Sequence, residues 1–237
     1  MNNTVGKYIG TLKTFMHWAT SRGYNTGTSF EKFKATKTDA DIIYLTEEEL
    51  MHLYYFDLSN NKRLSQVRDS FCFGCFTGLR FSDIERVTKE SVKGDELHIS
   101  SYKTKESIVI PLNDFSKAIL ERNEYKLHTI SNQKTNEYLK ELGKKAEINE
   151  PVTLVKHRGA EEVVYSEPKY NFISSHTARR TFVTLSLEKG MRPETVMSIT
   201  GHKEYKTFKK YIKLTDKVKK EEMHRVWNTD TGRLKIA

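Results

Sequence analysis

Four short stretches, far apart along the chain, carry side chains that suit the chemistry of phosphate esters. They are residues 77–83 (TGLRFSD), 102–105 (YKTK), 176–180 (HTARR), and 201–202 (GH) followed nine residues after the histidine by Tyr211. Arginine grips phosphate oxygens through paired hydrogen bonds and stays charged at physiological pH. A tyrosine phenol forms a phosphodiester that is readily broken again, because phenolate is a better leaving group than an alkoxide. Such a cluster can therefore move a phosphoryl group without a metal ion.

Taken together and in this order, the four stretches resemble the tyrosine recombinase, or phage integrase, family over about residues 42–225. A lone TGLR or HxxR would be a weak match, whereas the complete set with its spacing is specific. The resemblance implies the fold of the family's catalytic domain. It also implies an enzyme that cuts and rejoins duplex DNA through a covalent 3′-phosphotyrosyl intermediate.

The resemblance assigns phosphate binding to three side chains and a supporting role to a fourth. Arg80 and Arg179 are expected to hold the scissile phosphate, and His202 to be a further hydrogen-bond donor to it. Asp83 is three residues after Arg80 and is expected to support the arginines rather than to touch DNA.

The resemblance also assigns the nucleophile and the two proton-transfer groups. Tyr211 is expected to attack the phosphorus, and Lys103 to protonate the departing 5′ oxygen. His176 is expected to accept the tyrosine proton, and it lies three residues before Arg179, so that on a helix both side chains share one face. The expected catalytic residues are Arg80, Lys103, His176, Arg179, His202 and Tyr211.

Two of these assignments have a competitor nearby in the sequence. Lys105 is two residues from Lys103, and on a strand both would point to the same side. The spacing to residues 110–111 favours Lys103 in the family pattern. Tyr205 follows the GH pair by only three residues. Tyr211 is favoured because it follows two lysines on what we expect to be an exposed basic helix, an unusual place for a core tyrosine.

The charge of the chain indicates a polyanionic partner. It has 40 Lys and Arg against 31 Asp and Glu, a net charge of +9, which suits nucleic acid. Residues 203–220 hold eight lysines against two acidic residues. A solvated charged face is the usual explanation, but here the lysines surround the expected nucleophile. The residues expected to contact DNA are Lys105, Arg180, Lys203, Lys206, Lys209, Lys210 and Lys213.

No metal, cofactor or membrane is expected. Cys72 and Cys75 form a CxxC pair, but it lies within an apolar stretch and has no second ligand pair, which favours buried packing. The histidines lack the spacing of a metal site. No apolar run is long enough to cross a membrane, and two cysteines make no disulfide framework, so a cytoplasmic, nucleoid-associated protein is expected.

The hydrophobic periodicity predicts a mainly α fold with a small antiparallel β-sheet, an α+β domain. Residues 46–49 read TEEE, a capping box that starts a helix. Further helices are predicted over residues 5–19, 65–76, 114–128 and 132–146, from 81–83, and over most of the chain after residue 175, with breaks at Gly190, Pro193 and Gly201. Hairpins are predicted from residues 97–99 with 108–110, and within 151–165.

The pattern predicts two parts, residues 1–40 and 41–237. The first 20 residues carry a single apolar face, and residues 24–40 read as a linker. A helix of this kind cannot bury its own stripe, so we expect it to be the last helix of a core-binding domain. Family members generally carry a larger domain of this kind, so the chain is expected to be a trimmed form or a minimal member. A trimmed form should bind DNA weakly and recombine poorly.

The predicted activity is site-specific recombination, with strand exchange between two duplex DNA sites. The protein is expected to act as a homotetramer on DNA and to be a monomer when free. One alternative is a type IB topoisomerase that only relaxes supercoils, and another is a non-catalytic DNA-binding relative. A metal-dependent nuclease would need a carboxylate cluster that the sequence lacks.

Overall fold

The computed structural model describes residues 2–34, 42–102, 105–128, 130–159, 161–212 and 223–224. The chain divides into two compact units. The large unit consists of residues 42–149 and 169–237, and the small unit of residues 1–41 and 150–168. None of the helices in the described ranges is both long and apolar enough to span a bilayer.

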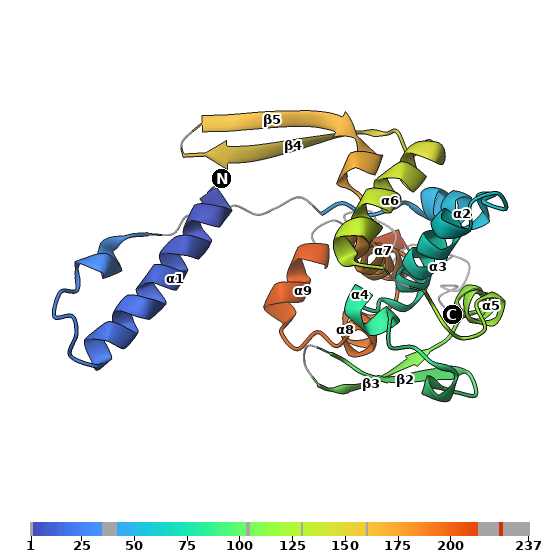
Figure 1. The fold of residues 1–237 in the computed structure, drawn as a ribbon, viewed down its shortest axis with the longest axis horizontal. Helices are drawn as coiled ribbons and strands as arrows, with labels where there is room; N and C mark the ends of the chain where they lie inside the picture. The colour runs from blue at the N-terminus through green and yellow to red at the C-terminus, as the bar shows by residue number, and fades with distance from the viewer. Residues whose placement is uncertain are drawn as a thin grey trace, which may run out of the picture. The chain divides into compact units, whose positions relative to one another are not determined.

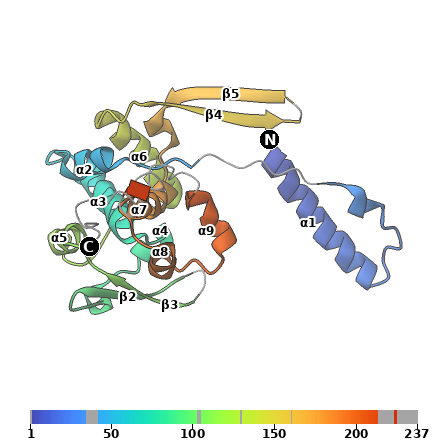
Figure 2. The same cartoon turned by 180° about the vertical axis from the view of Figure 1, so that it is seen from behind.

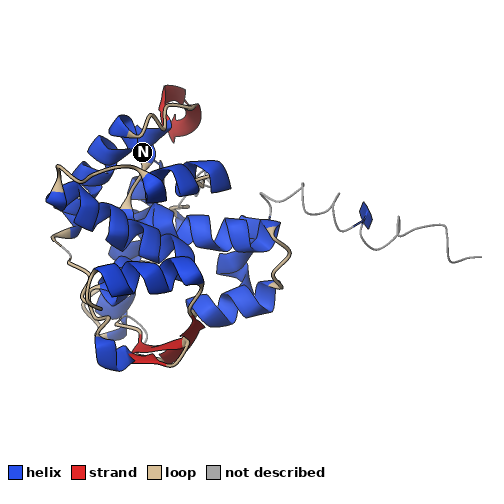
Figure 3. Cartoon of the chain, turned by 90° about the vertical axis from the view of Figure 1, so that its right-hand side faces the viewer, coloured by secondary structure: helices blue, strands red, loops and turns tan. Residues whose placement is uncertain are grey.

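The large unit is built mainly from helices, as Figure 3 shows by colour. Its helices are α2 (Glu47–Tyr55), α3 (Lys62–Thr77), α4 (Phe81–Ile84), η2 (Lys89–Ser91), α5 (Asp114–Arg122), α6 (Asn132–Lys145), η3 (Lys169–Phe172), α7 (Ser175–Glu188), α8 (Pro193–Thr200) and α9 (Tyr205–Ile212). Its strands are β1 (Val92–Lys93), β2 (Glu96–Ser100) and β3 (Ser107–Pro111), which form one antiparallel sheet in the order β1-β2-β3. The predicted mainly α fold with a small antiparallel sheet is confirmed.

Helix α7 is the central element of the large unit. It packs against α3, α6, α8 and α9, and both Figure 1 and Figure 2 show it among these helices. The approach of α3 to α7 is close, because a Cβ atom on Gly74 would lie 3.1 Å from the Cβ of Ala178. This contact brings the C-terminal part of α3 against the first turn of α7.

Two glycines end helices next to the segments that matter for the site. Gly78 follows α3 with φ of +70°, and Gly201 follows α8 with φ of +64°, both in the left-handed region that favours glycine. Neither position has room for a side chain. A Cβ on Gly78 would lie 2.5 Å from Phe182, and one on Gly201 would lie 2.8 Å from Ile108 of β3.

The predicted helix boundaries agree with the structure at some ends and not at others. The capping box at Thr46 is present, with the Glu49 amide donating to the threonine hydroxyl and the Glu49 carboxylate accepting from the Thr46 amide. The helix predicted over residues 114–128 was too long, because α5 ends at Arg122. Glu124 and Tyr125 have φ of +52° and +59°, which a right-handed helix cannot contain.

The small unit holds one long helix and one hairpin. Helix α1 (Asn2–Ser21) is followed by η1 (Ser29–Lys32), and β4 (Pro151–Arg158) pairs with β5 (Glu161–Pro168) in an antiparallel ribbon. The predicted apolar face of α1 remains open, with Tyr8 69% and Phe15 57% exposed. Its origin in a core-binding domain stays a prediction.

Candidate active site

Arg80 lies at the junction between α3 and α4 and is held from two sides. Its Nη1 donates a hydrogen bond of 3.1 Å to the buried hydroxyl of Ser101, which directly follows β2. The same nitrogen lies 3.8 Å from Oδ2 of Asp83, and Oδ1 of Asp83 accepts a 2.8 Å hydrogen bond from the Tyr102 amide. Asp83 therefore lies beside Arg80 and is tied to the segment after β2, and its supporting role stays a prediction.

Arg179 is buried in α7 and anchored by two helix ends. Its Nη1 donates to the carbonyl of Gly78 at 2.9 Å, and its Nη2 donates to the carbonyl of Thr200. These carbonyls lie at the C-terminal ends of α3 and α8, where the helix dipole favours a cation. Burial, followed by repulsion from Arg80, lowers the pKa of Arg179 to about 10, so the side chain stays charged at neutral pH.

His202 directly follows the glycine that ends α8. Its Nδ1 lies 2.7 Å from the hydroxyl of Thr200, and its ring nitrogens lie 3.3 and 3.4 Å from Nη2 of Arg179. Burial, then the charges of Arg179 and Arg80, lower the pKa of His202 to about 3. The imidazole is therefore neutral at physiological pH.

His176 lies in the first turn of α7, at the surface of the protein. The helix starts with a capping box between Ser174 and Thr177, which fixes where the turn begins. Partial burial, followed by the charges of Arg180 and Arg179, lowers the pKa of His176 to about 4. This histidine, too, is neutral near pH 7 and free to accept a proton.

Tyr211 is buried, with only 1% of its surface exposed, so the expectation that it lies on an exposed helix face was wrong. Its ring packs against Phe208 and lies 6.1 Å from the ring of His202. Burial raises the pKa of the Tyr211 phenol, and the guanidinium groups of Arg179 and Arg180 oppose this only in part. The phenol is protonated at neutral pH and needs a base before it can act as a nucleophile.

The basic residues around this cluster differ in their surroundings. Lys103 and Lys213 lie outside the described residues. Lys203 forms an ion pair of 2.7 Å with Glu106. Arg180 is half-buried, and its charge lowers the pKa of Lys210, after the larger effect of burial. The remaining predicted DNA contacts are exposed lysines: Lys105, Lys206 and Lys209.

The structure thus brings five of the six predicted catalytic residues into one neighbourhood of the large unit. Arg80, His176, Arg179 and Tyr211 all contribute to one another's electrostatics or to those of His202. Two charged arginines beside two neutral imidazoles and a phenol can bind a phosphate diester and move a proton next to it. The assigned role of each residue remains a prediction.

The cysteine pair lies outside this neighbourhood. Cys72 and Cys75 are free thiols buried in α3, and burial raises the pKa of Cys72 to about 12. Both are therefore unreactive packing residues, as expected from the sequence. The described ranges contain no group of three or more His, Cys, Asp or Glu side chains that could hold a metal ion.

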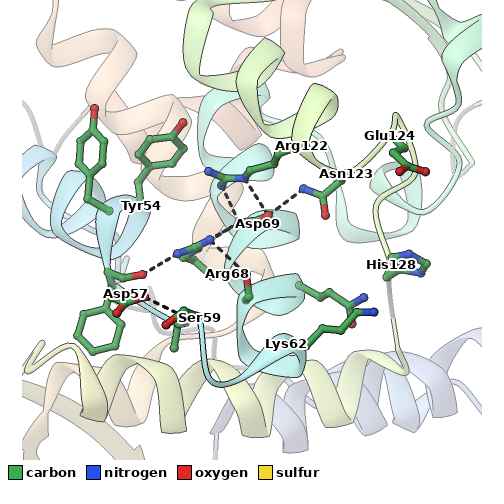
Figure 4. Close-up of a pocket in the computed structure, with 15 residues that line it drawn as sticks. Tyr54, Asp57, Ser59, Lys62, Arg68, Asp69, Arg122, Asn123, Glu124 and His128 are labelled. Carbon is green, nitrogen blue, oxygen red and sulfur yellow. Dashed lines mark hydrogen bonds and ion pairs between the residues drawn. The ribbon is translucent and has the colours of Figure 1, made fainter.

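A separate surface pocket of about 910 Å³ is lined by none of the predicted catalytic residues. Figure 4 shows Asp69 at its centre. The buried Asp69 carboxylate accepts hydrogen bonds from Arg68, Arg122 and Asn123. All three Arg68 nitrogens donate within the protein. Nε donates to Asp69, Nη1 to the carbonyl of Phe56 and Nη2 to the hydroxyl of Ser65. This network holds the middle of α3 to the C-terminal end of α5, and we assign it a structural role.

Comparison with known proteins identifies the family. The sequence profile of the phage integrase family matches residues 44–218. The chain therefore belongs to this family, the tyrosine recombinases. No curated protein matches the sequence.

Three solved structures illustrate the likeness in fold. A lambda integrase dimer bound to a COC′ core site has a TM-score of 0.67 at 17% identity, covering 89% of this chain and 73% of that chain. The Tn1549 transposon integrase in complex with circular intermediate DNA has a TM-score of 0.67 at 17% identity, covering 94% and 79%. A lambda integrase tetramer bound to a Holliday junction has a TM-score of 0.62 at 17% identity, covering 86% and 57%. The large unit has the fold of a tyrosine recombinase catalytic domain.

Proposed function

We propose that the protein is a site-specific DNA recombinase that cleaves duplex DNA by attack of Tyr211 on a backbone phosphate. The observation that supports this most is the convergence of Arg80 and Arg179, 99 positions apart in the sequence, beside His202 and Tyr211. A phosphate placed there would meet two guanidinium groups. Each such preorganised donor can stabilise the transition state by about a few kcal/mol.

In the proposed cleavage step, residues of this chain supply and accept every proton that moves. The Tyr211 oxygen bonds to phosphorus and its proton passes to the neutral imidazole of His176. The bond from phosphorus to the 5′ oxygen breaks, and Lys103 gives that oxygen a proton, which leaves a 5′ hydroxyl and a 3′-phosphotyrosyl link. Arg80 and Arg179 offset the negative charge of the pentavalent state. In the reverse step a 5′ hydroxyl from a second duplex attacks the phosphotyrosine and completes strand exchange.

The proposed partner is duplex DNA, bound by a homotetramer of this chain that forms on the DNA. Family membership supports this, as do relatives whose structures are a dimer on a core site and a tetramer on a Holliday junction. The exposed lysines Lys206 and Lys209 lie on α9, five and two residues before Tyr211, and would contact the phosphate backbone. We propose that the protein acts in the cytoplasm, on the nucleoid.

The proposal is tested by trapping on a nicked suicide substrate. The native chain should form a covalent protein–DNA adduct, and Tyr211→Phe should form none. Tyr205→Phe is the matched control, because Tyr205 lies on the same helix but is 53% exposed, and it should form the adduct normally. An adduct with Tyr211→Phe would contradict the nucleophile. Relaxation of supercoiled plasmid without joining of two sites would favour a topoisomerase instead.

A further inference from the structure

Thr200 contacts two site residues at once, although nothing in its position along the sequence marks it. It is the last residue of α8 and is 1% exposed. Its backbone carbonyl accepts a hydrogen bond from Nη2 of Arg179, and its hydroxyl lies 2.7 Å from Nδ1 of His202. One buried threonine therefore fixes the places of an arginine and a histidine that come from different segments.

The hydroxyl of Thr200 has one proton, and the geometry indicates where it goes. The oxygen lies 2.6 Å from the carbonyl of Val196, one turn earlier in α8. A carbonyl can only accept, so at this distance the hydroxyl donates to it. Toward His202 the hydroxyl can then only accept. Nδ1 of the imidazole then carries the proton, and in the neutral ring Nε2 keeps the lone pair, toward which Nη2 of Arg179 can donate at 3.4 Å.

We propose that Thr200 is a positioning residue of the active site, which holds His202 in the tautomer protonated at Nδ1 and orients Nε2 as a proton acceptor. The inference rests on the proposed function only for its catalytic consequence, because the tautomer is a property of the free protein. It also changes the role expected for His202. Its Nε2 accepts in the neutral state and becomes a donor to phosphate only after it takes up a proton.

The charged and titratable groups around His202 favour this neutral state. They are Arg80 before α4, His176 and Arg179 on α7, and Lys210 and Tyr211 on α9. The cations among them repel a proton on Nε2 until an anion arrives. A bound phosphate would remove this repulsion, so that His202 takes up a proton as the substrate binds.

The experiment compares Thr200→Val with Thr200→Ser. Valine keeps the shape and the backbone carbonyl that holds Arg179 but removes the hydroxyl, whereas serine keeps the hydroxyl. Thr184→Val is the control for loss of a buried hydroxyl, because the Thr184 hydroxyl finds no hydrogen-bond partner among the described residues. Nitrogen-15 NMR of the imidazole reports the tautomer of His202 in the free protein, with His202→Asn used to assign its signals.

The expected result is a His202 ring protonated at Nδ1 in the native chain, in Thr200→Ser and in Thr184→Val. In Thr200→Val the ring should shift to a mixture of tautomers. Adduct formation on the suicide substrate should fall about tenfold in Thr200→Val, the size expected for the loss of one hydrogen bond, and should recover in Thr200→Ser.

Either of two outcomes overturns the inference: a native His202 protonated at Nε2, or a tautomer that Thr200→Val leaves unchanged. Thermal unfolding of each variant separates a loss of folding from a change of tautomer. If the native chain forms no adduct while the tautomer shifts as expected, the proposed function fails and the positioning role of Thr200 stands.

Discussion

Arg80 and Ser101 are 21 positions apart in sequence and are joined by a hydrogen bond of 3.1 Å. Ser101 is completely buried, so the bond holds the guanidinium against a fixed point rather than a mobile side chain. Asp83 adds a second tie to the same segment through the Tyr102 amide. Since the predicted general acid Lys103 follows two residues after Ser101, this link ties Arg80, the arginine predicted to bind phosphate, to the segment that leads to the predicted acid.

Replacing Ser101 by alanine should therefore affect catalysis more than stability. The loss of one hydrogen bond should lower the free energy of unfolding by about 1 kcal/mol, measured by urea denaturation. Adduct formation should fall by a larger factor, because Arg80 is no longer held in place. Ser100→Ala is the matched control, since that side chain is exposed and one residue away. Equal rates for the two variants would show that the Ser101 bond has no role in positioning.

The two site histidines should make stability depend on pH. Their pKa values in the folded chain are about 4 for His176 and about 3 for His202, against about 6.5 in an unfolded chain. Below about pH 6.5 the unfolded state therefore binds protons that the folded state does not. The stabilisation that comes from the two lowered pKa values is fully present above about pH 6.5, and it is lost as the pH falls toward the pKa values of the histidines in the folded chain.

His202→Gln should flatten this dependence. Urea midpoints measured in steps from neutral pH down to about pH 4 should fall less steeply for the variant than for the native chain. His52→Gln, at an exposed histidine of α2, serves as the control and should keep the native slope. A native midpoint that rises on acidification through this window would contradict the depressed pKa values.

Asp69 should be essential for stability and dispensable for chemistry. Its carboxylate is buried and pairs with Arg68, whose side chain is only 11% exposed. Asp69→Ala would leave that arginine without its counter-ion, which costs about 3–5 kcal/mol for a buried pair. Urea denaturation should show this loss, while adduct formed per folded molecule should stay at the native level. Asp57→Ala changes an exposed carboxylate of the same pocket and should leave the midpoint almost unchanged.

Local signals in the sequence were enough to predict the end of α3 and the start of α2. The TG pair at residues 77–78 marks the end of α3, and the TEEE capping box marks the start of α2. Both depend on side chains within a few residues of each other, so the sequence contains all the information they need. The overshoot of α5 arose because Glu124 and Tyr125 take positive φ values without a glycine to indicate it.

The burial of Tyr211 was not predicted, because the many lysines nearby suggested an exposed helix and their positions around the helix axis were not considered. On a helix, Phe208 and Tyr211 are three residues apart and share one face, and both are buried. Lys209 and Lys210 lie on the opposite side and remain exposed. The i, i+3 aromatic pair is a signal that could have indicated the buried face.

Ser101 and Thr200 could not have been found by spacing at all. Each acts on a residue from another segment, Ser101 on Arg80 and Thr200 on Arg179, and Thr200 also contacts His202 two residues after it. Small hydroxyl residues are common, and only the packed structure shows which of them face the site. Positioning residues of this kind follow from tertiary contacts and not from a local pattern.

DNA binding should be coupled to proton uptake. The pKa values of His176 and His202 are low because of burial and because the charges of Arg80, Arg179, Arg180 and Lys210 repel a proton. A phosphate between these groups offsets the positive charge and raises both pKa values. The complex then binds protons that the free protein does not, so affinity should increase as the pH falls from about 7.5 to about 5.5.

Fluorescence anisotropy with Tyr211→Phe measures this without cleavage. Adding His176→Gln and His202→Gln to that chain should remove most of the pH dependence, because lysine, arginine and the DNA phosphates do not titrate in this range. The same chain with His52→Gln should keep it. Affinity that is independent of pH in the Tyr211→Phe chain would mean that the bound phosphate does not reach the histidines, and the DNA would then lie outside the site formed by Arg80 and Arg179.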